Sequence, residues 1–354
     1  MNFKTLILLA ASAAILLFFA AKNIFDDKTN KTKTEKAQFK RFKIAILTPA
    51  THPSLQQIEN GFCKTINKIK DLKRDLKTVM GDEIKHKYDI SVFNANGDKI
   101  LLHAQAEEII SQDFDLIFTI GTTSSQLCKE LCIKKGKHTP IVFGAVADPV
   151  RIGLVKSLQK PEGCVTGAVE APDYKTQLNL LLQLKPNIKN ILLIYNPSQG
   201  SCLERDKDEI EQLLSQKKVN LISCEIYNTN EIQGKLAGLI QSADVVLILK
   251  DNTVVSGIDG IIKLCNLYHV TLMATDLDSG DKGAALSFGV QESAFGEQAA
   301  MLARKILEEG ANPADLPCIT DYKNELNINR KTMNDQGLVI PENMLHLLKY
   351  TKTI

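Results

Sequence analysis

A run of hydroxyl-bearing residues follows one of the most apolar segments of this chain. Residues 116–120 read LIFTI, and Gly121, Thr122, Thr123 and Ser124 come directly after them. If a helix starts here, its first N–H groups have no partner within the helix, and the helix dipole favours an anion beside them. Together with the hydroxyls they could hold a carboxylate. The alternative is an ordinary helix cap, because Ser and Thr are common capping residues.

A second polar pair, Asp251 and Asn252, ends another apolar run. A carboxylate at such a strand end could hold an ammonium group through charge-assisted hydrogen bonds. The alternative is again a helix cap, for a helix that begins near Thr253. Lys250 stands immediately before the pair and could neutralise Asp251.

Further candidate ligand-binding residues also stand where apolar runs end or helices begin. His52, before a proline, could donate to a ligand or only stabilise the turn. Asp148 and Asn196 each precede a proline, which ends strand pairing and leaves an exposed loop. Tyr195 could cover an apolar part of a ligand, or pack in the core with its hydroxyl at the surface. Asp276 follows a further apolar run.

Known catalytic and nucleotide-binding motifs are absent from the sequence. The six His show no H-E-x-x-H spacing, and there is no nucleophile elbow, P-loop or dinucleotide fingerprint. We therefore predict no catalytic residue, no metal ion and no other cofactor. The net charge of only +2 also argues against nucleic-acid binding, which normally requires a pronounced basic excess.

The elements that must position these residues alternate between strand and helix. Apolar runs separated by helical periodicity are typical of βαβ units and parallel sheets. Strands are predicted at 43–48, 88–93, 116–120 and 141–146, and then at 190–195, 220–226, 245–249 and 271–274. Helices are predicted near 126–134, 174–184, 203–216, 230–241, 254–267 and 294–307, and the first helix starts near Pro53. Ligands bind at the carboxyl edge of such sheets, where all the candidates stand.

The amino terminus is predicted to be a targeting segment. Lys4 is followed by uncharged, mostly apolar residues up to position 21, a length between that of a signal peptide and that of a membrane anchor. Both alternatives stay open. Residues 22–41 are basic and predicted to be a tether. Because export permits disulfides, some of the eight Cys could pair, but their spacing favours small buried hydrophobes, with one or two disulfides as the alternative.

Short motifs along nearly the whole exported part resemble one family, the ABC-transporter substrate-binding proteins of the type that bind tryptophan and related amino acids. In order, these motifs are His52-Pro53-Ser54-Leu55, Gly61-Phe62, Gly121-Thr122-Thr123, Ala147-Asp148-Pro149, Val165-Thr166-Gly167, Tyr195-Asn196-Pro197, Asp251-Asn252-Thr253-Val254, Gly283 to Val290, Leu326-Asn327 and Gly337 to Pro341.

The resemblance implies an α/β fold of two Rossmann-like lobes, the type I periplasmic-binding-protein fold, joined by a three-strand hinge. The expected lobes are residues 42–166 plus 284–315 and residues 167–283 plus 316–354. The implied function is that of the non-enzymatic binding component of an ABC importer. It would be a monomer in the periplasm, or on the outer face of the cytoplasmic membrane, that carries an amino-acid-like ligand to an ABC permease. The alternatives are a membrane-tethered ligand-sensing receptor of the same fold, and an enzyme built on two α/β lobes.

Overall fold

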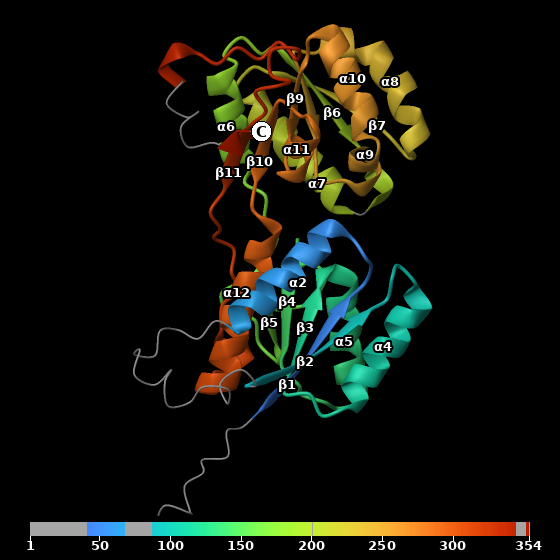
Figure 1. The fold of residues 1–354 in the computed structure, drawn as a ribbon, viewed down its shortest axis with the longest axis vertical. Helices are drawn as coiled ribbons and strands as arrows, with labels where there is room; N and C mark the ends of the chain where they lie inside the picture. Colours follow the sequence, from blue (N-terminus) through green and yellow to red (C-terminus); the bar gives the residue numbers. More distant parts are fainter. Residues whose placement is uncertain (1–40, 68–86, 200, 345–351, 354) are drawn as a thin grey trace, which may run out of the picture. The chain divides into compact units, whose positions relative to one another are not determined.

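The structure is a computed structural model that describes residues 41–67, 87–199, 201–344 and 352–353 (Figure 1). The predicted leader (1–21) and almost all of the predicted tether (22–41) lie outside these residues. In the part of the chain that the structure describes, no helix is long and apolar enough to cross a membrane. All eight Cys are free thiols in this structure, and five of them are buried.

The first sheet has five parallel strands in the order β2-β1-β3-β4-β5. Its strands are β1 (Phe42–Thr48), β2 (Tyr88–Asn94), β3 (Leu116–Ile120), β4 (Ile141–Val146) and β5 (Val165–Val169). Every residue of β3 is buried, as a parallel strand covered on both faces requires. The strands predicted for this lobe agree with β1 to β4 within one residue at each end.

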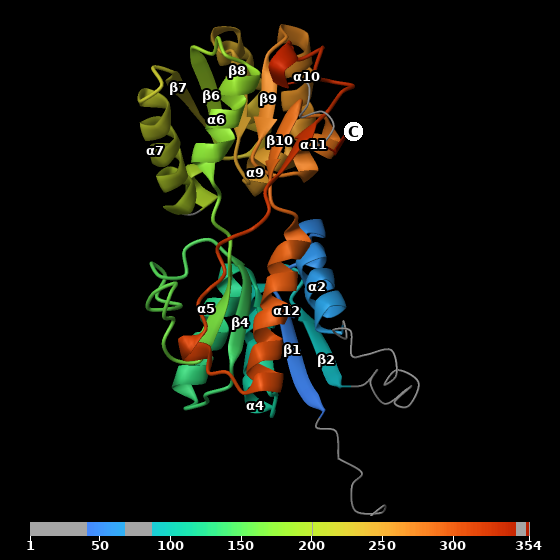
Figure 2. The ribbon, with the colours of Figure 1, turned by 90° about the vertical axis from the view of Figure 1, so that its left-hand side faces the viewer.

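Helices cover both faces of this sheet. The helices α2 (Pro53–Ile66) and α12 (Glu292–Glu309) lie side by side on one face, and α4 (Lys99–Ser111) and α5 (Gly121–Lys134) on the other (Figures 1 and 2). Glycines allow α2 and α12 to approach closely. A Cβ on Gly61 would overlap the backbone of Ser293, and one on Gly296 would overlap the backbone of Ile58. The amino-terminal turn of α12 is therefore held firmly in place.

The second sheet has seven strands in the order β12-β11-β10-β9-β8-β6-β7. Its strands are β6 (Asn190–Tyr195), β7 (Asn220–Glu225), β8 (Val245–Ile248), β9 (Thr271–Ala274), β10 (Leu286–Gly289), β11 (Glu325–Ile328) and β12 (Lys352–Thr353). The strands β6 to β10 run parallel, whereas β11 runs antiparallel to β10 and has β12 parallel beside it. The four strands predicted here agree with β6 to β9 within one residue at each end.

Two helices also cover each face of the second sheet. The helices α6 (Tyr174–Leu184) and α7 (Ser201–Ser215) pack on one face, and α8 (Ile232–Leu239) and α10 (Ile258–Tyr268) on the other. Two short helices, α9 (Asn252–Ser256) and α11 (Asp278–Lys282), follow β8 and β9. The prediction of a single helix at 254–267 is wrong, because the helix is interrupted at Gly257, which lies between α9 and α10.

The chain passes between the two sheets three times: after β5, after β10, and between the short helix η5 (Pro313–Asp315) and β11. This confirms the predicted fold of two Rossmann-like lobes joined by three segments. Three predicted boundaries need correction. The strand β5 stays in the first sheet as far as Val169, beyond 166, and β10 belongs to the second sheet although the return was predicted from 284. The third is wrong because Ile319, predicted to belong to the second lobe, pairs with Ala168 of β5 in the first sheet. In all three places backbone pairing continues past the predicted boundary. That each lobe is a separate domain stays a prediction.

Candidate functional site

The first lobe has a topological switch point between β1 and β3. These strands are neighbours, but α2, which follows β1, and α5, which follows β3, pack on opposite faces of the sheet. The loops at the carboxyl ends of the two strands therefore diverge, and in open α/β sheets this is where ligands bind. His52 stands in one loop and Gly121 begins the other element.

The amino terminus of α5 leaves several polar groups available. The helix begins at Gly121, five residues before the predicted start at 126. Gly121 adopts a φ of 77°, and no side chain caps the helix, so the Ser and Thr residues are not the ordinary cap considered above. Thr122 and Thr123 are exposed. The hydroxyl of Ser124 is completely buried and has no hydrogen-bond partner among the described residues.

His52 caps α2. Its Nδ1 accepts a hydrogen bond from the backbone N–H of Ser54 at 3.3 Å, which is the turn-stabilising alternative. The ring is exposed, and its Nε2 makes no hydrogen bond with any described residue. The hydroxyl of the preceding Thr51 donates a hydrogen bond to Asn96 and accepts one from Asn94, the last residue of the neighbouring strand β2. The loop is thus anchored, and a ligand contact by His52 stays a prediction.

The second lobe has its own switch point, between β6 and β8. There Asp251, which follows β8, is hydrogen-bonded to Asn196, which follows β6. One carboxylate oxygen accepts the N–H groups of Thr253 at 2.8 Å and Val254 at 3.2 Å, and the other accepts the N–H of Asn196 at 2.5 Å. Asp251 is only 1% exposed. Both oxygens are therefore occupied by backbone donors, which is the helix-cap geometry. Asn252 opens α9 and is exposed.

The other predicted residues of this lobe are also engaged within the protein. The side chain of Asn196 donates to Thr253 and accepts from the N–H and the hydroxyl of Ser198. Tyr195 is 2% exposed, packs in the core, and donates its hydroxyl to Glu204, which is the core alternative considered for it. Both oxygens of Asp276 accept hydrogen bonds from Ser279, at the start of α11.

Asp148 takes part in ion pairs. One carboxylate oxygen lies 2.6 Å from Arg205 of α7 and 3.3 Å from Arg151, and the other accepts the backbone N–H of Arg151. Beside this group lies a cavity of about 230 Å³. It is lined by Ala147, Asp148, Pro149, Val150, Leu158, Val169, Ala171, Pro172, Arg205, Asp206 and Glu209. A ligand contact by Asp148 stays a prediction.

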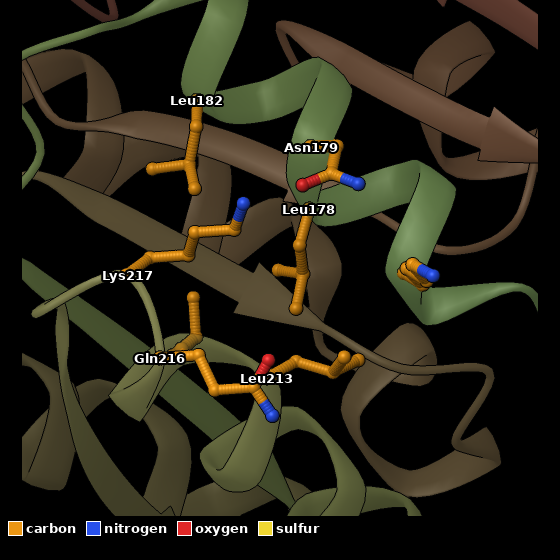
Figure 3. A pocket seen from close by; sticks show the side chains of 8 residues that line it. Leu178, Asn179, Leu182, Leu213, Gln216 and Lys217 are labelled. Atoms are coloured by element: carbon orange, nitrogen blue, oxygen red, sulfur yellow. The ribbon is translucent and has the colours of Figure 1, made fainter.

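A smaller pocket of about 70 Å³ lies between α6 and the end of α7 (Figure 3). Leu178, Leu182 and Leu213 contribute apolar side chains to it, and Gln216 and Lys217 contribute polar ones. It lies on the helical layer, away from the carboxyl edges of the strands, so we do not assign it to the ligand site. In the described ranges, no group of three or more His, Cys, Asp and Glu side chains is placed to hold a metal ion.

A cluster that the sequence did not reveal surrounds Lys250. Its ammonium lies 2.5 Å from Glu170, which follows β5, and 2.6 Å from Glu292, the first residue of α12. It also lies 5.7 Å from the centre of the Phe295 ring. The idea that Lys250 neutralises Asp251 is therefore wrong, because its charge is paired with these two carboxylates instead.

Burial dominates the titration of this cluster. It raises the pKa of Glu292 to about 7, an effect that Lys250 opposes and the nearby Glu170 reinforces. Burial also opposes the charge on Lys250, but the two carboxylates outweigh it and raise the pKa of the amine. Only one oxygen of Glu292 contacts Lys250. The other, Oε2, is buried and has no partner among the described side chains and backbone groups.

Comparison with known proteins identifies the family. The model of the ABC transporter substrate-binding protein family matches residues 43–352, so this chain belongs to that family. Members of this family are extracytoplasmic and non-enzymatic, and they hand a small molecule to a membrane permease. The chain is thus a solute-binding component of an ABC transporter.

Two curated relatives cover most of the chain. The tyrosine-binding protein of Clostridioides difficile (strain R20291) is 29% identical over 329 residues, which are 93% of this chain and 90% of that protein. The uncharacterized protein RP367 of Rickettsia prowazekii (strain Madrid E) is 30% identical over 306 residues, 85% of this chain and 88% of that protein.

Solved structures show the same fold. A ligand-free, open substrate-binding protein with adhesive properties from Clostridium difficile has a TM-score of 0.71 and 26% identity, covering 89% of this chain and 99% of that one. An ABC domain in complex with L-Trp, from Streptococcus pneumonia, has a TM-score of 0.70 and 23% identity, covering 88% of this chain and 99% of that one. These likenesses agree with the predicted type I periplasmic-binding-protein fold.

Proposed function

We propose that this chain binds an aromatic L-amino acid and delivers it to its permease. The observation that carries the proposal is the amino terminus of α5. There, the exposed hydroxyls of Thr122 and Thr123, and the buried hydroxyl of Ser124 that has no partner among the described residues, lie in the first turn of the helix at a topological switch point. An α-carboxylate fits this donor set. The relative named for tyrosine and the structural neighbour that holds L-Trp support an aromatic amino acid as the ligand.

In this proposal the carboxylate accepts hydrogen bonds from the first turn of α5. The backbone N–H groups and the hydroxyls of Thr122 and Thr123 donate, and the helix dipole adds a favourable field. The buried hydroxyl of Ser124, which has no partner in the part of the chain that the structure describes, gains one when the ligand is present. His52, across the switch point, offers its exposed ring as a further donor.

Asp251, Asn196 and Tyr195 act on the ligand only indirectly in this proposal. Their polar atoms are occupied by other groups of the protein, so they shape the loops after β6 and β8. Asp148 and Asp276, with their own internal partners, act in the same indirect way on the loops after β4 and β9.

Isothermal titration calorimetry of the purified full chain against a panel of L-amino acids tests the proposal. We expect L-tyrosine or L-tryptophan to bind, and aliphatic or acidic amino acids to bind more weakly. Thr122→Ala should weaken binding about 2- to 10-fold, because one neutral donor contributes about 0.5–1.5 kcal/mol. Thr176→Ala, which removes an exposed Thr from the first turn of α6, is the matched control and should bind normally. A panel in which no aromatic amino acid binds would refute the proposal.

A further inference from the structure

We propose that Glu292 receives the ammonium group of the ligand, and that Lys250 and Glu170 hold its carboxylate in place. This inference rests on the proposed function and deepens it. It assigns the ammonium to a residue that lies far along the chain from the switch-point loops and outside the sequence candidates.

The first argument is the unpartnered oxygen. Glu292 is 8% exposed, and its Oε2 is buried with no donor among the described residues. A buried carboxylate oxygen without a hydrogen bond costs free energy, so such a group calls for a donor that arrives from outside the protein. A primary ammonium supplies a charged N–H at this position.

The second argument is charge. Glu170 and Glu292 share the single ammonium of Lys250, and Asp276 and Asp278 lie close enough to interact with members of the cluster. Four acids thus surround one base, and the surplus negative charge favours a further cation.

The third argument is position. Glu170 follows β5, Lys250 follows β8, and Glu292 follows β10, so all three stand just beyond the carboxyl ends of parallel strands. Two of them lie on segments that connect the sheets. The close contact of α12 with α2 at Gly296 fixes the helix that carries Glu292. A carboxylate that is already held in place loses little conformational entropy on binding, which favours affinity.

Asp251, the sequence candidate for this role, is less suited to it. Both of its oxygens already accept backbone N–H groups. A ligand ammonium could reach them only by displacing those donors. Glu292 offers an oxygen that nothing else in the described chain uses.

The test compares two ligands with the full-chain protein by calorimetry: L-tyrosine, and 3-(4-hydroxyphenyl)propionate, which lacks only the ammonium. If wild type binds L-tyrosine, Glu292→Gln should weaken that binding about 30-fold or more, by the usual effect of truncating one partner of a buried charge pair. Binding of the propionate should stay unchanged. Glu297→Gln, a partly buried Glu about one turn further along α12, is the control and should bind both ligands as wild type does.

A second measurement uses wild type alone. The charged neighbours of Glu292 are Lys250, Glu170 and Asp278, and its pKa is raised to about 7. At pH 6 the carboxyl is therefore largely protonated, and it must release its proton when an ammonium binds. Calorimetry in two buffers of different ionisation enthalpy should show close to one proton released with L-tyrosine and none with the propionate.

The outcomes separate this inference from the proposed function. If wild type binds no aromatic amino acid, the proposed function fails. If wild type binds L-tyrosine, but Glu292→Gln binds it equally well or no proton is released, the ammonium assignment is overturned while the proposed function stands.

Discussion

Replacing Asp251 separates a structural carboxylate from a ligand-binding one. Asp251→Ala removes the acceptor of three backbone N–H groups, those of Asn196, Thr253 and Val254, and two of these hydrogen bonds lie in buried surroundings. Each buried N–H left without an acceptor costs about 1–3 kcal/mol, and loss of a helix cap costs about 0.5–2 kcal/mol. We therefore expect the free energy of unfolding to fall by about 2–5 kcal/mol.

Asp251→Asn is the more informative variant. Asn caps helices about as well as Asp, so the bonds to Thr253 and Val254 can survive. Its amide nitrogen cannot accept the N–H of Asn196, which should cost about 1–3 kcal/mol. Equilibrium urea unfolding followed by circular dichroism measures both changes, and Asp259→Ala, an exposed residue of α10, should stay within about 0.5 kcal/mol of wild type.

The ligand affinity of the folded Asp251→Asn protein decides between the two roles. If the carboxylate is structural, the affinity for L-tyrosine stays close to that of wild type. If Asp251→Asn keeps its stability but loses tenfold or more in affinity, Asp251 holds the ammonium and the structural reasoning is refuted.

Three further predictions concern packing, titration and export. Gly296→Ala should destabilise the protein by about 3 kcal/mol or more in urea unfolding, because its Cβ would overlap the backbone of α2. The control is Gly234→Ala on α8, where the added Cβ meets open space and should stabilise the protein by about 0.5–1 kcal/mol. Equal effects of the two substitutions would contradict the packing argument. The pKa of Glu292 is about 7 in the fold and 4.5 as the ordinary value, so wild type should lose on the order of 3 kcal/mol of stability as pH rises through this window. The Glu292→Gln protein should not lose stability in this pH range. If the free energy of unfolding of both proteins changes with pH in the same way, the raised pKa of Glu292 is contradicted. Residues 1–45 fused to a reporter protein should direct export of the reporter, and a reporter retained in the cytoplasm would refute the predicted leader. Mass spectrometry of the native protein should show either an uncleaved amino terminus at Met1 or an amino terminus near Lys22.

The strands and most helices could be predicted from the sequence because their signals are local. Apolar runs that end at Asp148-Pro149 and Asn196-Pro197 mark both the strands and their exposed carboxyl ends, and those ends lie as expected. The start of α5 was predicted too late, because its Ser and Thr residues have the composition of a cap. In the structure they already belong to the helix.

The cluster around Glu292 could not be predicted, because its members are brought together only by the fold. Lys250 and Glu170 are 80 positions apart, and Glu292 comes from a third strand end. In the sequence Asp251 adjoins Lys250, which suggested a pair between neighbours. In the structure Asp251 accepts the backbone N–H of Asn196, whereas Lys250 pairs with Glu170. A local sequence pattern cannot predict these different partners.

The most direct test of the account is a crystal structure of the full chain with its ligand, preceded by a fluorescence titration with L-tryptophan. The chain contains no Trp, so indole fluorescence in the complex reports the ligand alone. The account predicts saturable binding. It also predicts a carboxylate within hydrogen-bonding distance of the first turn of α5 at Thr122 and an ammonium beside the Oε2 atom of Glu292. A ligand whose carboxylate lies elsewhere, or a tryptophan titration without saturable binding, would contradict it.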